Sequence, residues 1–384
     1  MLDIMRILSN QQHLLRYSMY QIKKITLIPI ALTMLQAFET AHHTISERPL
    51  TIVTVELLNE DSGEIAVGYG EVQSFADFSY TLENQSVSRE ILKTVLLPQI
   101  RRFSFSNPQS FSIRLNQLTP FASFAKAGLE MAVWDAIGKL THQSLQQMIH
   151  GQGGTVPVGI AVGMADSIDE ALTQGYQRIK LKIDAHVVDF ENLNRLLKKY
   201  PEQQFSIDAN SSFTDKNIAQ INRLPENVGF IEQPLGENDF VQHAVLQAHT
   251  SKIISLDESI NNLNDVATML KCLSAKALTI KQGKIGGISN ALTAIQLVDK
   301  PWVGGMLTSG LGRSVDIAIS SLPKIAFPGD ISDSRRYFER DIIEERLRVN
   351  NGIISVPRNY GIGVTVDLNA ISDLQTEQMF TITD

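Results

Sequence analysis

The chain has 384 residues, of which 43% are hydrophobic and 20% charged, and its formal net charge is −7. Such a composition is typical of a globular protein with an ample core, and the length favours two domains. The negative charge and the lack of any block of Lys and Arg argue against nucleic acid as the main partner. No segment reaches the ~20 apolar residues that span a bilayer, so we expect a small-molecule partner.

Residues 1–18 carry basic side chains but neither a continuous apolar run nor a small-residue cleavage site, which argues against a signal peptide. We expect them to form a disordered extension. Cys272 is the one cysteine, which excludes an internal disulfide and a thiolate metal cluster and fits a cytoplasmic protein. It lies in a helix-like stretch, where we expect a small buried apolar residue.

Residues 19–150 have the pattern of an α+β domain. Alternating β-branched runs between residues 22 and 72, with a turn at EDSGE, predict an antiparallel hairpin or meander. Helical patterns follow at 88–100 and 121–140. In the second of these, apolar spacing predicts one shared face, formed by Ala127, Met131, Trp134 and Ile137.

After the glycine-rich break at 151–155, short strands alternate with amphipathic segments, which is typical of a parallel sheet or barrel. Seven strands are visible and an eighth is weak. We therefore predict a modified TIM barrel, (β/α)7β, over 151–345, and a segment 346–384 that returns to the first domain and completes it. The seven strands are expected near 156–163, 179–183, 205–209, 229–232, 253–257, 278–281 and 302–305.

Five of these strands end in charged residues at steps of 24 to 26 residues. Such a step matches one strand plus one helix, and in a parallel barrel the ends of the strands meet at one mouth. Three carboxylates and three ammonium groups are thus expected around one cavity between the barrel and the first domain. These residues are Lys180 and Lys182, Asp208, Glu232, Asp257 and Lys281.

Asp208, Glu232 and Asp257 offer hard oxygen ligands on successive strands. Oxygen sets of this kind suit Mg²⁺, with Mn²⁺ as a substitute, and a divalent cation would offset the mutual repulsion of three carboxylates. A single acidic residue after a strand often caps the next helix or solvates a loop, but three at matching intervals favour the metal.

Lys180 and Lys182 stand two residues apart on one strand, so both side chains point to the same face, into the barrel. The neighbouring charge and partial desolvation would lower the pKa of one amine and make it a usable base. Lys281, four strands further on, would face the pair across the cavity. The alternative is a structural ring of lysines paired with carboxylates.

From about Met19 to the C-terminus, the chain resembles the enolase superfamily, which uses a Lys or His base with Mg²⁺. Further segments resemble the subgroup that contains o-succinylbenzoate synthase and N-succinylamino-acid racemase. The motifs that carry the superfamily resemblance are KLKID, DANSSF, FIEQP, LDES and IKQGKIGG; those of the subgroup are FAKAGLEMAVWDAIGK, GYGEVQSFADFSYTLEN, GGMLTSG and PGDISDSRRYFERDI.

This resemblance implies removal of a proton α to a carboxylate held on Mg²⁺. In the synthase, 2-succinyl-6-hydroxy-2,4-cyclohexadiene-1-carboxylate loses water and becomes o-succinylbenzoate, a step of menaquinone biosynthesis. Lys182 would be the base and then the acid, Lys180 would lower the pKa of Lys182 and help hold the carboxylate, and Lys281 would stabilise the anion. In the racemase, Lys182 and Lys281 would act as bases on opposite faces.

The segment Phe38 to Ser46 looks like the specificity loop of the family, with adjacent His42 and His43, either solvated or in contact with a substrate carboxylate. The glycines of GGMLTSGLG could offer backbone N–H groups at a helix start to the succinyl carboxylate. Gln282 stands where proline is common, and Thr308 and Ser309 where an acidic residue is frequent. The residues that we expect to support the metal ligands or to bind the substrate are Asn210, Glu258, Gly305, Met306, Ser309, Phe38 and Thr40.

We therefore expect a cytoplasmic lyase, an Mg²⁺-dependent o-succinylbenzoate synthase, that acts on a small carboxylate, has no nucleic-acid or membrane partner, and forms a homo-oligomer. A racemase or a bifunctional enzyme is the first alternative. The second is a non-catalytic ligand-binding barrel that has kept the fold, which intact lysines and carboxylates argue against.

Overall fold

The computed structural model describes residues 18–39, 44–163 and 168–384. The first part of the chain forms an antiparallel sheet in the order β15-β1-β2-β3, with β4 also paired to β1. This confirms the predicted meander, because β2 and β3 flank the EDSGE turn. The strands are β1 (Tyr20–Glu39), β2 (Thr44–Asn59), β3 (Ile65–Val72), β4 (Ser104–Phe105) and β15 (Phe380–Thr383).

Helix α5 (Ser123–Leu140) packs on this sheet and is buried along almost its whole length. Its contact with β3 is so close that a Cβ at Gly70 would collide with the backbone oxygen of Gly128. The single shared face that we predicted for α5 is wrong in part, because Met131 and Trp134 pack in the barrel core whereas Ile137 packs in the core of the sheet. The other elements here are α2 (Gln85–Ile91), η1 (Leu92–Leu96), α3 (Leu97–Ile100), α4 (Pro108–Leu118) and α6 (Leu145–Met148).

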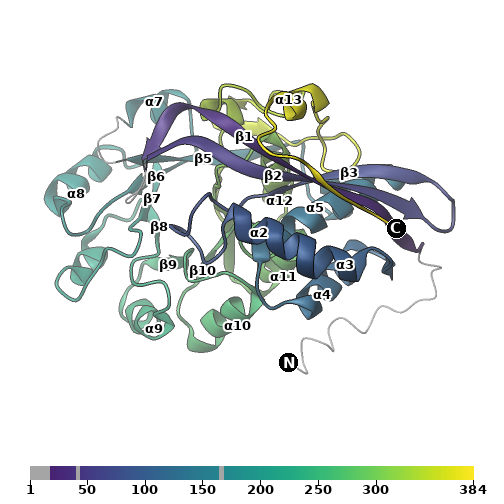
Figure 1. Cartoon of the computed structure of the whole chain (residues 1–384). Helices are drawn as coiled ribbons and strands as arrows, with labels where there is room; N and C mark the ends of the chain where they lie inside the picture. The colour runs from purple at the N-terminus through teal and green to yellow at the C-terminus, as the bar shows by residue number, and fades with distance from the viewer. Residues whose placement is uncertain (1–17, 40–43, 164–167) are drawn as a thin grey trace.

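The second sheet contains all seven predicted strands, which are parallel and pair with one another in chain order (Figure 1). Their residues are buried almost without alternation, as expected of parallel strands covered on both sides. The strands are β5 (Thr155–Gly163), β6 (Arg178–Lys182), β7 (Gln204–Asp208), β8 (Val228–Glu232), β9 (Ile253–Leu256), β10 (Ala277–Ile280) and β11 (Lys300–Val303).

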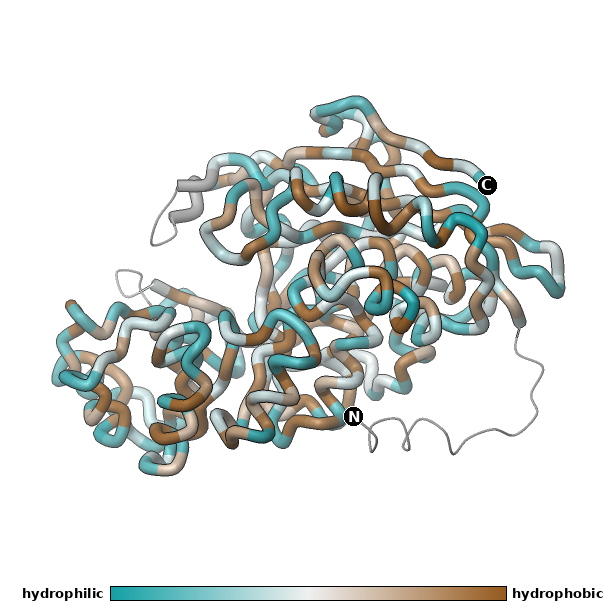
Figure 2. The backbone as a smooth tube through the Cα atoms, turned by 60° about the horizontal axis from the view of Figure 1, so that its bottom comes forward, coloured by the Kyte–Doolittle hydropathy of each residue, from teal (hydrophilic) through white to brown (hydrophobic). Residues whose placement is uncertain are grey.

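Helical segments alternate with these strands, and hydrophilic and hydrophobic stretches alternate along them in Figure 2, as amphipathic helices require. They are α7 (Asp169–Thr173), α8 (Phe190–Lys199), η2 (Ile218–Arg223), α9 (Phe240–His249), α10 (Leu263–Cys272), α11 (Ile288–Leu297) and α12 (Gly310–Ser320). None of the helices in the described ranges has the length and apolar character that a membrane crossing requires.

The weak eighth strand is β12 (Gly329–Asp330), which pairs in parallel with β5. Just before it, Phe327 forms a parallel bridge with Trp302 of β11, and the Ala326 amide donates to the Pro301 carbonyl at 2.8 Å. Segment 326–330 therefore contacts both end strands of the parallel sheet, as the modified barrel requires.

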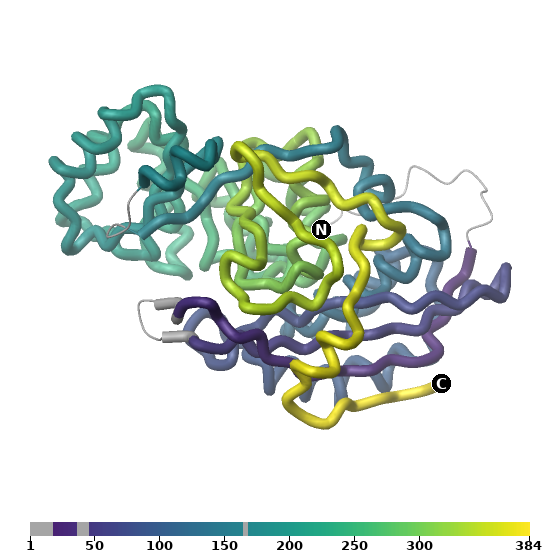
Figure 3. Tube along the Cα trace, turned by 90° about the horizontal axis from the view of Figure 1, so that it is seen from above, coloured from purple at the N-terminus to yellow at the C-terminus, as the bar shows by residue number. Residues whose placement is uncertain are grey.

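The tail divides between the two sheets. Strand β14 (Ile353–Ser355) pairs with β5 of the barrel and with β13 (Val349–Asn350), whereas β15 pairs with β1. Figure 3 shows this last segment, in yellow, beside the purple N-terminal strand. The expectation that the whole tail completes the first domain is thus corrected for β13 and β14. The remaining elements are η3 (Ser334–Arg336) and α13 (Leu368–Asp373).

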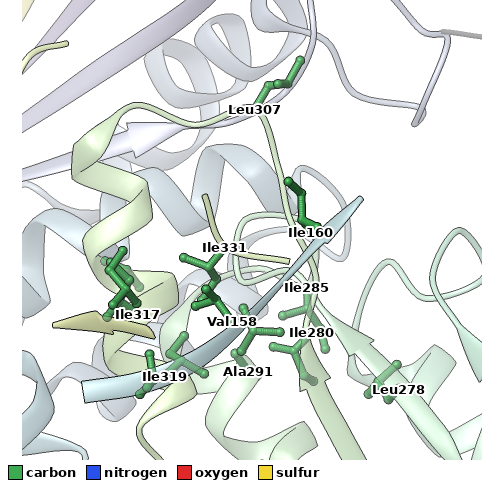
Figure 4. Packing of buried hydrophobic residues seen from close by; sticks show 14 of the residues in the cluster. Val158, Ile160, Leu278, Ile280, Ile285, Ala291, Leu307, Ile317, Ile319 and Ile331 are labelled. Carbon is green, nitrogen blue, oxygen red and sulfur yellow. The ribbon is translucent and has the colours of Figure 1, made fainter. Parts of the chain in front are cut away.

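The barrel core is formed by branched aliphatic side chains from the parallel strands and from α12. Figure 4 shows Val158 of β5, Ile280 of β10 and Ile317 of α12 among them. Cys272 does not contribute to it. The prediction that this cysteine is buried is wrong, because α10 buries Val266 and Met269 and ends at Cys272, which is exposed to solvent.

Candidate active site

Strand β6 carries three cationic side chains on the face that points into the barrel, those of Arg178, Lys180 and Lys182. The ammonium group of Lys180 is buried and lies 2.7 Å from Glu232, 2.7 Å from Asp330 and 3.1 Å from Asp208. Burial alone would lower the pKa of Lys180, but Asp208, Asp330 and Glu232 outweigh it and raise that pKa well above its ordinary value. Lys180 is therefore held as a cation.

Lys182 lies at the end of the same strand in a different environment. Its side chain is 44% exposed, and its ammonium group is 4.0 Å from Asp208. We expected partial desolvation to lower the pKa of one amine of the pair, and this is wrong for Lys180, which is desolvated but has a raised pKa because of its three carboxylate partners. Lys182 is open to a ligand at the mouth of the barrel. The reason is depth, because two residues along a strand separate the side chains by one full pleat.

The three predicted metal ligands all lie at neighbouring strand ends and are buried. The carboxylate of Glu232 accepts from Lys180 and, at 2.9 Å, from the hydroxyl of Thr279. Burial raises its pKa to about 8; Lys180 opposes this, and the charges of Asp208 and Asp257 add to it. The mutual repulsion that we expected among the three carboxylates thus contributes to the raised pKa of Glu232.

Asp257 follows β9 and is held by cations on the other side of the barrel. The ammonium of Lys281 lies 2.5 Å and that of Lys284 3.5 Å from its carboxylate. Burial would raise the pKa of Asp257, but these two lysines lower it well below its ordinary value. Gly304 makes room for this arrangement, because a Cβ there would come within 3.1 Å of Lys281 Cε.

Tyr80 reaches the same cluster from the first domain. Its hydroxyl accepts from Lys281 at 2.7 Å and donates to Asp257 at 3.1 Å, and the ammonium groups of Lys281 and Lys284 lie 4.9 and 5.1 Å from the centre of its ring. Our sequence reasoning missed Tyr80 and Lys284. Two features of the sequence could have pointed to them: Tyr80 lies within GYGEVQSFADFSYTLEN, one of the segments that resemble the subgroup, and Lys284 follows Lys281 by three residues.

Asn210 and Glu258 also come together at the mouth. The Asn210 amide side chain donates to Glu258 at 3.0 Å, and its backbone N–H donates to Asp208 at 3.3 Å. Asn210 has a φ of 41°, a left-handed conformation that asparagine tolerates better than most residues. Burial, then Asp257 and Asp208, raise the pKa of Glu258 to about 7.

The loop after β11 differs from expectation. The N–H of Ser309 donates to Glu71 at 3.2 Å, and the N–H of Gly310 donates to Asp341 at 2.8 Å. These amides at the start of α12 are occupied by the protein's own carboxylates, which corrects their expected role in binding a succinyl carboxylate. Met306 is buried in the core of the first domain, and Gly305 packs against Asp330.

Residues expected in the specificity loop lie largely outside the described part of the chain. Thr40, His42 and His43 fall there, and only the backbone of Phe38, in β1, is described. Their roles therefore stay predictions.

The donors fit a divalent cation in chemistry and charge, although no group of three His, Cys, Asp or Glu side chains in the described ranges is arranged as a metal site. The reason is visible in the contacts, since Lys180 bridges Asp208 and Glu232 while Lys281 and Lys284 hold Asp257. The Oε2 atom of Glu258 is buried without a hydrogen-bond partner. A cation would have to take these oxygens from the ammonium groups.

The cluster is balanced in formal charge when every group in it is ionised. A divalent cation would leave an excess of two positive charges, which a doubly charged anion would neutralise. Its anions are Asp208, Glu232, Asp257, Glu258 and Asp330, and its cations are Arg178, Lys180, Lys182, Lys281 and Lys284.

Comparison with known proteins identifies two family models. Residues 24–150 match the N-terminal domain of mandelate racemase / muconate lactonizing enzyme, and residues 163–370 match the enolase C-terminal domain-like family. Together they span most of the chain.

Curated relatives include an o-succinylbenzoate synthase of Bacillus subtilis (strain 168), 35% identical over 91% of this chain and 95% of the relative. An N-succinylamino acid racemase of Thermus thermophilus is 33% identical over 86% of this chain and 91% of the relative. A solved enolase superfamily member from Listeria innocua has a TM-score of 0.87 and 32% identity, covering 95% of this chain and 99% of that one.

Proposed function

Because this chain belongs to the enolase superfamily, in the family of o-succinylbenzoate synthases and N-succinylamino acid racemases, we propose that it is an o-succinylbenzoate synthase. The reaction is the loss of water from 2-succinyl-6-hydroxy-2,4-cyclohexadiene-1-carboxylate, as in menaquinone biosynthesis. Relatives named o-succinylbenzoate synthase from three organisms are 32–35% identical over at least 90% of the chain.

The observation that carries the proposal is the placement of lysines on opposite strands around the buried carboxylates. Lys182 ends β6, and Lys281 follows β10, four strands further along the sheet. A substrate carboxylate between them has one amine on each face of its α-carbon. This arrangement suits removal of an α-proton.

We propose that Asp208, Glu232 and Asp257 hold Mg²⁺, which Mn²⁺ can replace. When bound, the cation supplies Lewis-acid polarisation of the substrate carboxylate and so acidifies the α-proton. Lys182 takes that proton as base. It then returns it to the hydroxyl that leaves, so that water departs, the ring becomes aromatic and the amine is regenerated.

Lys281 stabilises the anion from the opposite face. Its own charge is secured by Asp257, Glu232 and Glu258: although burial alone would lower the pKa of Lys281, these carboxylates raise it. The doubly negative form of a carboxylate that has lost its α-proton matches the two positive charges that a divalent cation would add to the cluster.

Turnover of the diene and proton exchange separate this function from its alternative. Loss of the diene absorbance should be fast with Mg²⁺ present, whereas exchange of the α-proton of an N-succinylamino acid in D₂O reports racemase activity. An enzyme that exchanges this proton but leaves the diene unchanged is a racemase, and the synthase proposal would then be wrong.

Racemisation is the second candidate, and it is favoured by Lys281 on the face opposite Lys182 and by the Thermus thermophilus relative. A non-catalytic barrel predicts neither reaction. The cytoplasmic location, the homo-oligomeric state and the domain boundaries at residues 18, 150 and 345 stay predictions.

A further inference from the structure

Asp330 joins the cluster from the two-residue strand β12, and we did not predict it among the charged residues at strand ends. One of its carboxylate oxygens lies 2.6 Å from the guanidinium of Arg178, and the other lies 2.7 Å from the ammonium of Lys180. All three side chains are buried. Asp330 is thus a single anion shared by two successive inward cations of β6.

Glycines allow Asp330 to come this close. A Cβ at Gly305 would lie 2.7 Å from the Asp330 carbonyl, and one at Gly329 would lie 2.9 Å from the Val303 carbonyl. Gly159 leaves similar room for Arg178, whose nitrogen would be 3.1 Å from a Cβ there. The approach of β12 to its neighbours is therefore built into the backbone.

Of the three carboxylates around Lys180, two are the proposed metal ligands Asp208 and Glu232. A divalent cation that takes their oxygens repels the ammonium group and removes two of its partners. Asp330 is not among the proposed metal ligands, and its other carboxylate oxygen pairs with Arg178. It can keep Lys180 paired inside the barrel, where an unpaired buried charge would be costly.

We infer that Asp330 is a positioning residue that holds the Lys180 ammonium when a divalent cation takes Asp208 and Glu232. The inference rests on the metal site of the proposed function. It assigns Arg178 the part of a support, since Ser206 and the Pro328 carbonyl, at 2.6 and 2.9 Å, fix the guanidinium that orients Asp330.

The test is titration calorimetry of the full-length protein with Mg²⁺ and no substrate. In Asp330→Asn, the anionic partners left to the Lys180 ammonium within the described residues are the metal ligands Asp208 and Glu232, so the ammonium competes with the cation for them. The Asp330→Asn variant should bind Mg²⁺ about tenfold more weakly than the wild type, which is within the range of coupling free energies between contacting charges. Asp135→Asn, which removes a buried ion-paired carboxylate of the first domain, should leave this affinity unchanged.

A double-mutant cycle decides whether Asp330 acts through Lys180. Lys180→Met removes the competing ammonium and should tighten Mg²⁺ binding, and adding Asp330→Asn to it should then change little. If Asp330→Asn weakens binding by the same factor in both backgrounds, Asp330 acts only by its general field and the inference is overturned. Unchanged affinity in Asp330→Asn overturns it as well.

Asp330→Asn leaves the buried Arg178 unpaired and can impair folding, so the cycle is repeated with Arg178→Met present in all four proteins. In this background, Asp330→Asn no longer leaves a buried guanidinium unpaired, because Arg178→Met has removed it. Because calorimetry uses no substrate, its result is separate from the proposed reaction. If the cycle gives the expected coupling but the wild-type protein does not convert the diene, the inference stands and the synthase proposal is wrong. If the wild-type protein binds no Mg²⁺, both are wrong.

Discussion

Lys180 and Lys182 occupy one face of one strand and yet have different tasks. Lys180 is enclosed by three carboxylates and stays charged, whereas Lys182 is 44% exposed at the strand end, with Asp208 4.0 Å away. A proton acceptor must reach the substrate and change its charge during turnover. Of the two, Lys182 is the one placed to do so.

We predict that Lys182→Ala abolishes both diene dehydration and N-succinylamino acid racemisation, since each begins with proton removal by this amine. Loss of a general base costs about 10²- to 10⁴-fold in kcat. Steady-state assays of both reactions measure the loss. Lys198→Ala, an exposed lysine of α8, is the control and should keep wild-type rates; activity retained in Lys182→Ala would instead support a different base.

Lys281→Ala should separate the two reactions. Racemisation needs an amine on each face, so it should disappear, whereas syn elimination needs one base and should survive in part. Proton exchange in D₂O and diene absorbance are compared on the same preparation. Lys276→Ala serves as the control, because Lys276 is exposed and directly precedes β10, the strand that Lys281 follows. Racemisation that persists without Lys281 contradicts the two-base mechanism.

At the scale of elements, the start of α12 joins the first domain to the barrel. Glu71 of β3 accepts hydrogen bonds from the backbone and hydroxyl of Ser309, while Asp341 accepts from Gly310. Arg48 of β2 adds a hydrogen bond of 2.8 Å to the Leu307 carbonyl. The loop between β11 and α12 is therefore fixed by two charged side chains of the first domain, Glu71 and Arg48, and by Asp341.

Glu71 should make stability depend on pH. Burial raises its pKa from 4.5 to about 7, against Ser309 and Arg48 and helped by Asp341. The folded protein then keeps a proton that the unfolded chain has released, so this residue lowers the free energy of unfolding as pH rises from about 4.5 to about 7, by at most about 3 kcal/mol.

In Glu71→Gln this titration is absent. The free energy of unfolding of the variant, measured by urea denaturation, should therefore increase relative to that of the wild type as pH rises from about 4.5 to about 7. Glu64→Gln, an exposed position of the neighbouring turn, is the matched control. A difference between Glu71→Gln and wild type that is constant over this range would show that Glu71 is ionised throughout.

At the scale of the whole molecule, the site needs both domains. The barrel supplies its lysines and carboxylates, the first domain supplies Tyr80, and β12 supplies Asp330. The N-terminal sheet extends along the barrel in Figure 1, and the last strand returns to it. Binding at this cluster should thus stabilise the folded chain as a whole.

We predict that Mg²⁺ raises the melting temperature and that EDTA abolishes turnover until Mg²⁺ is restored. A ligand at 100 times its Kd adds about 2.7 kcal/mol of stability. Thermal unfolding with and without Mg²⁺ measures this. Asp257→Asn should lose the shift and Asp215→Asn, at an exposed position, should keep it; an equal shift in both variants would place the cation elsewhere.

The barrel, its seven strands and the series of charged strand ends from Lys180 to Lys281 could be predicted from the sequence, because parallel strands end at one mouth and strand-plus-helix spacing is regular. Which of these groups pair with one another became known only from the three-dimensional structure. Tyr80 and Asp330 lie far from this series in sequence, and Lys180 and Lys182 look alike until their depth is known. Charge pairing and burial depend on three-dimensional distance, which spacing along the chain does not encode.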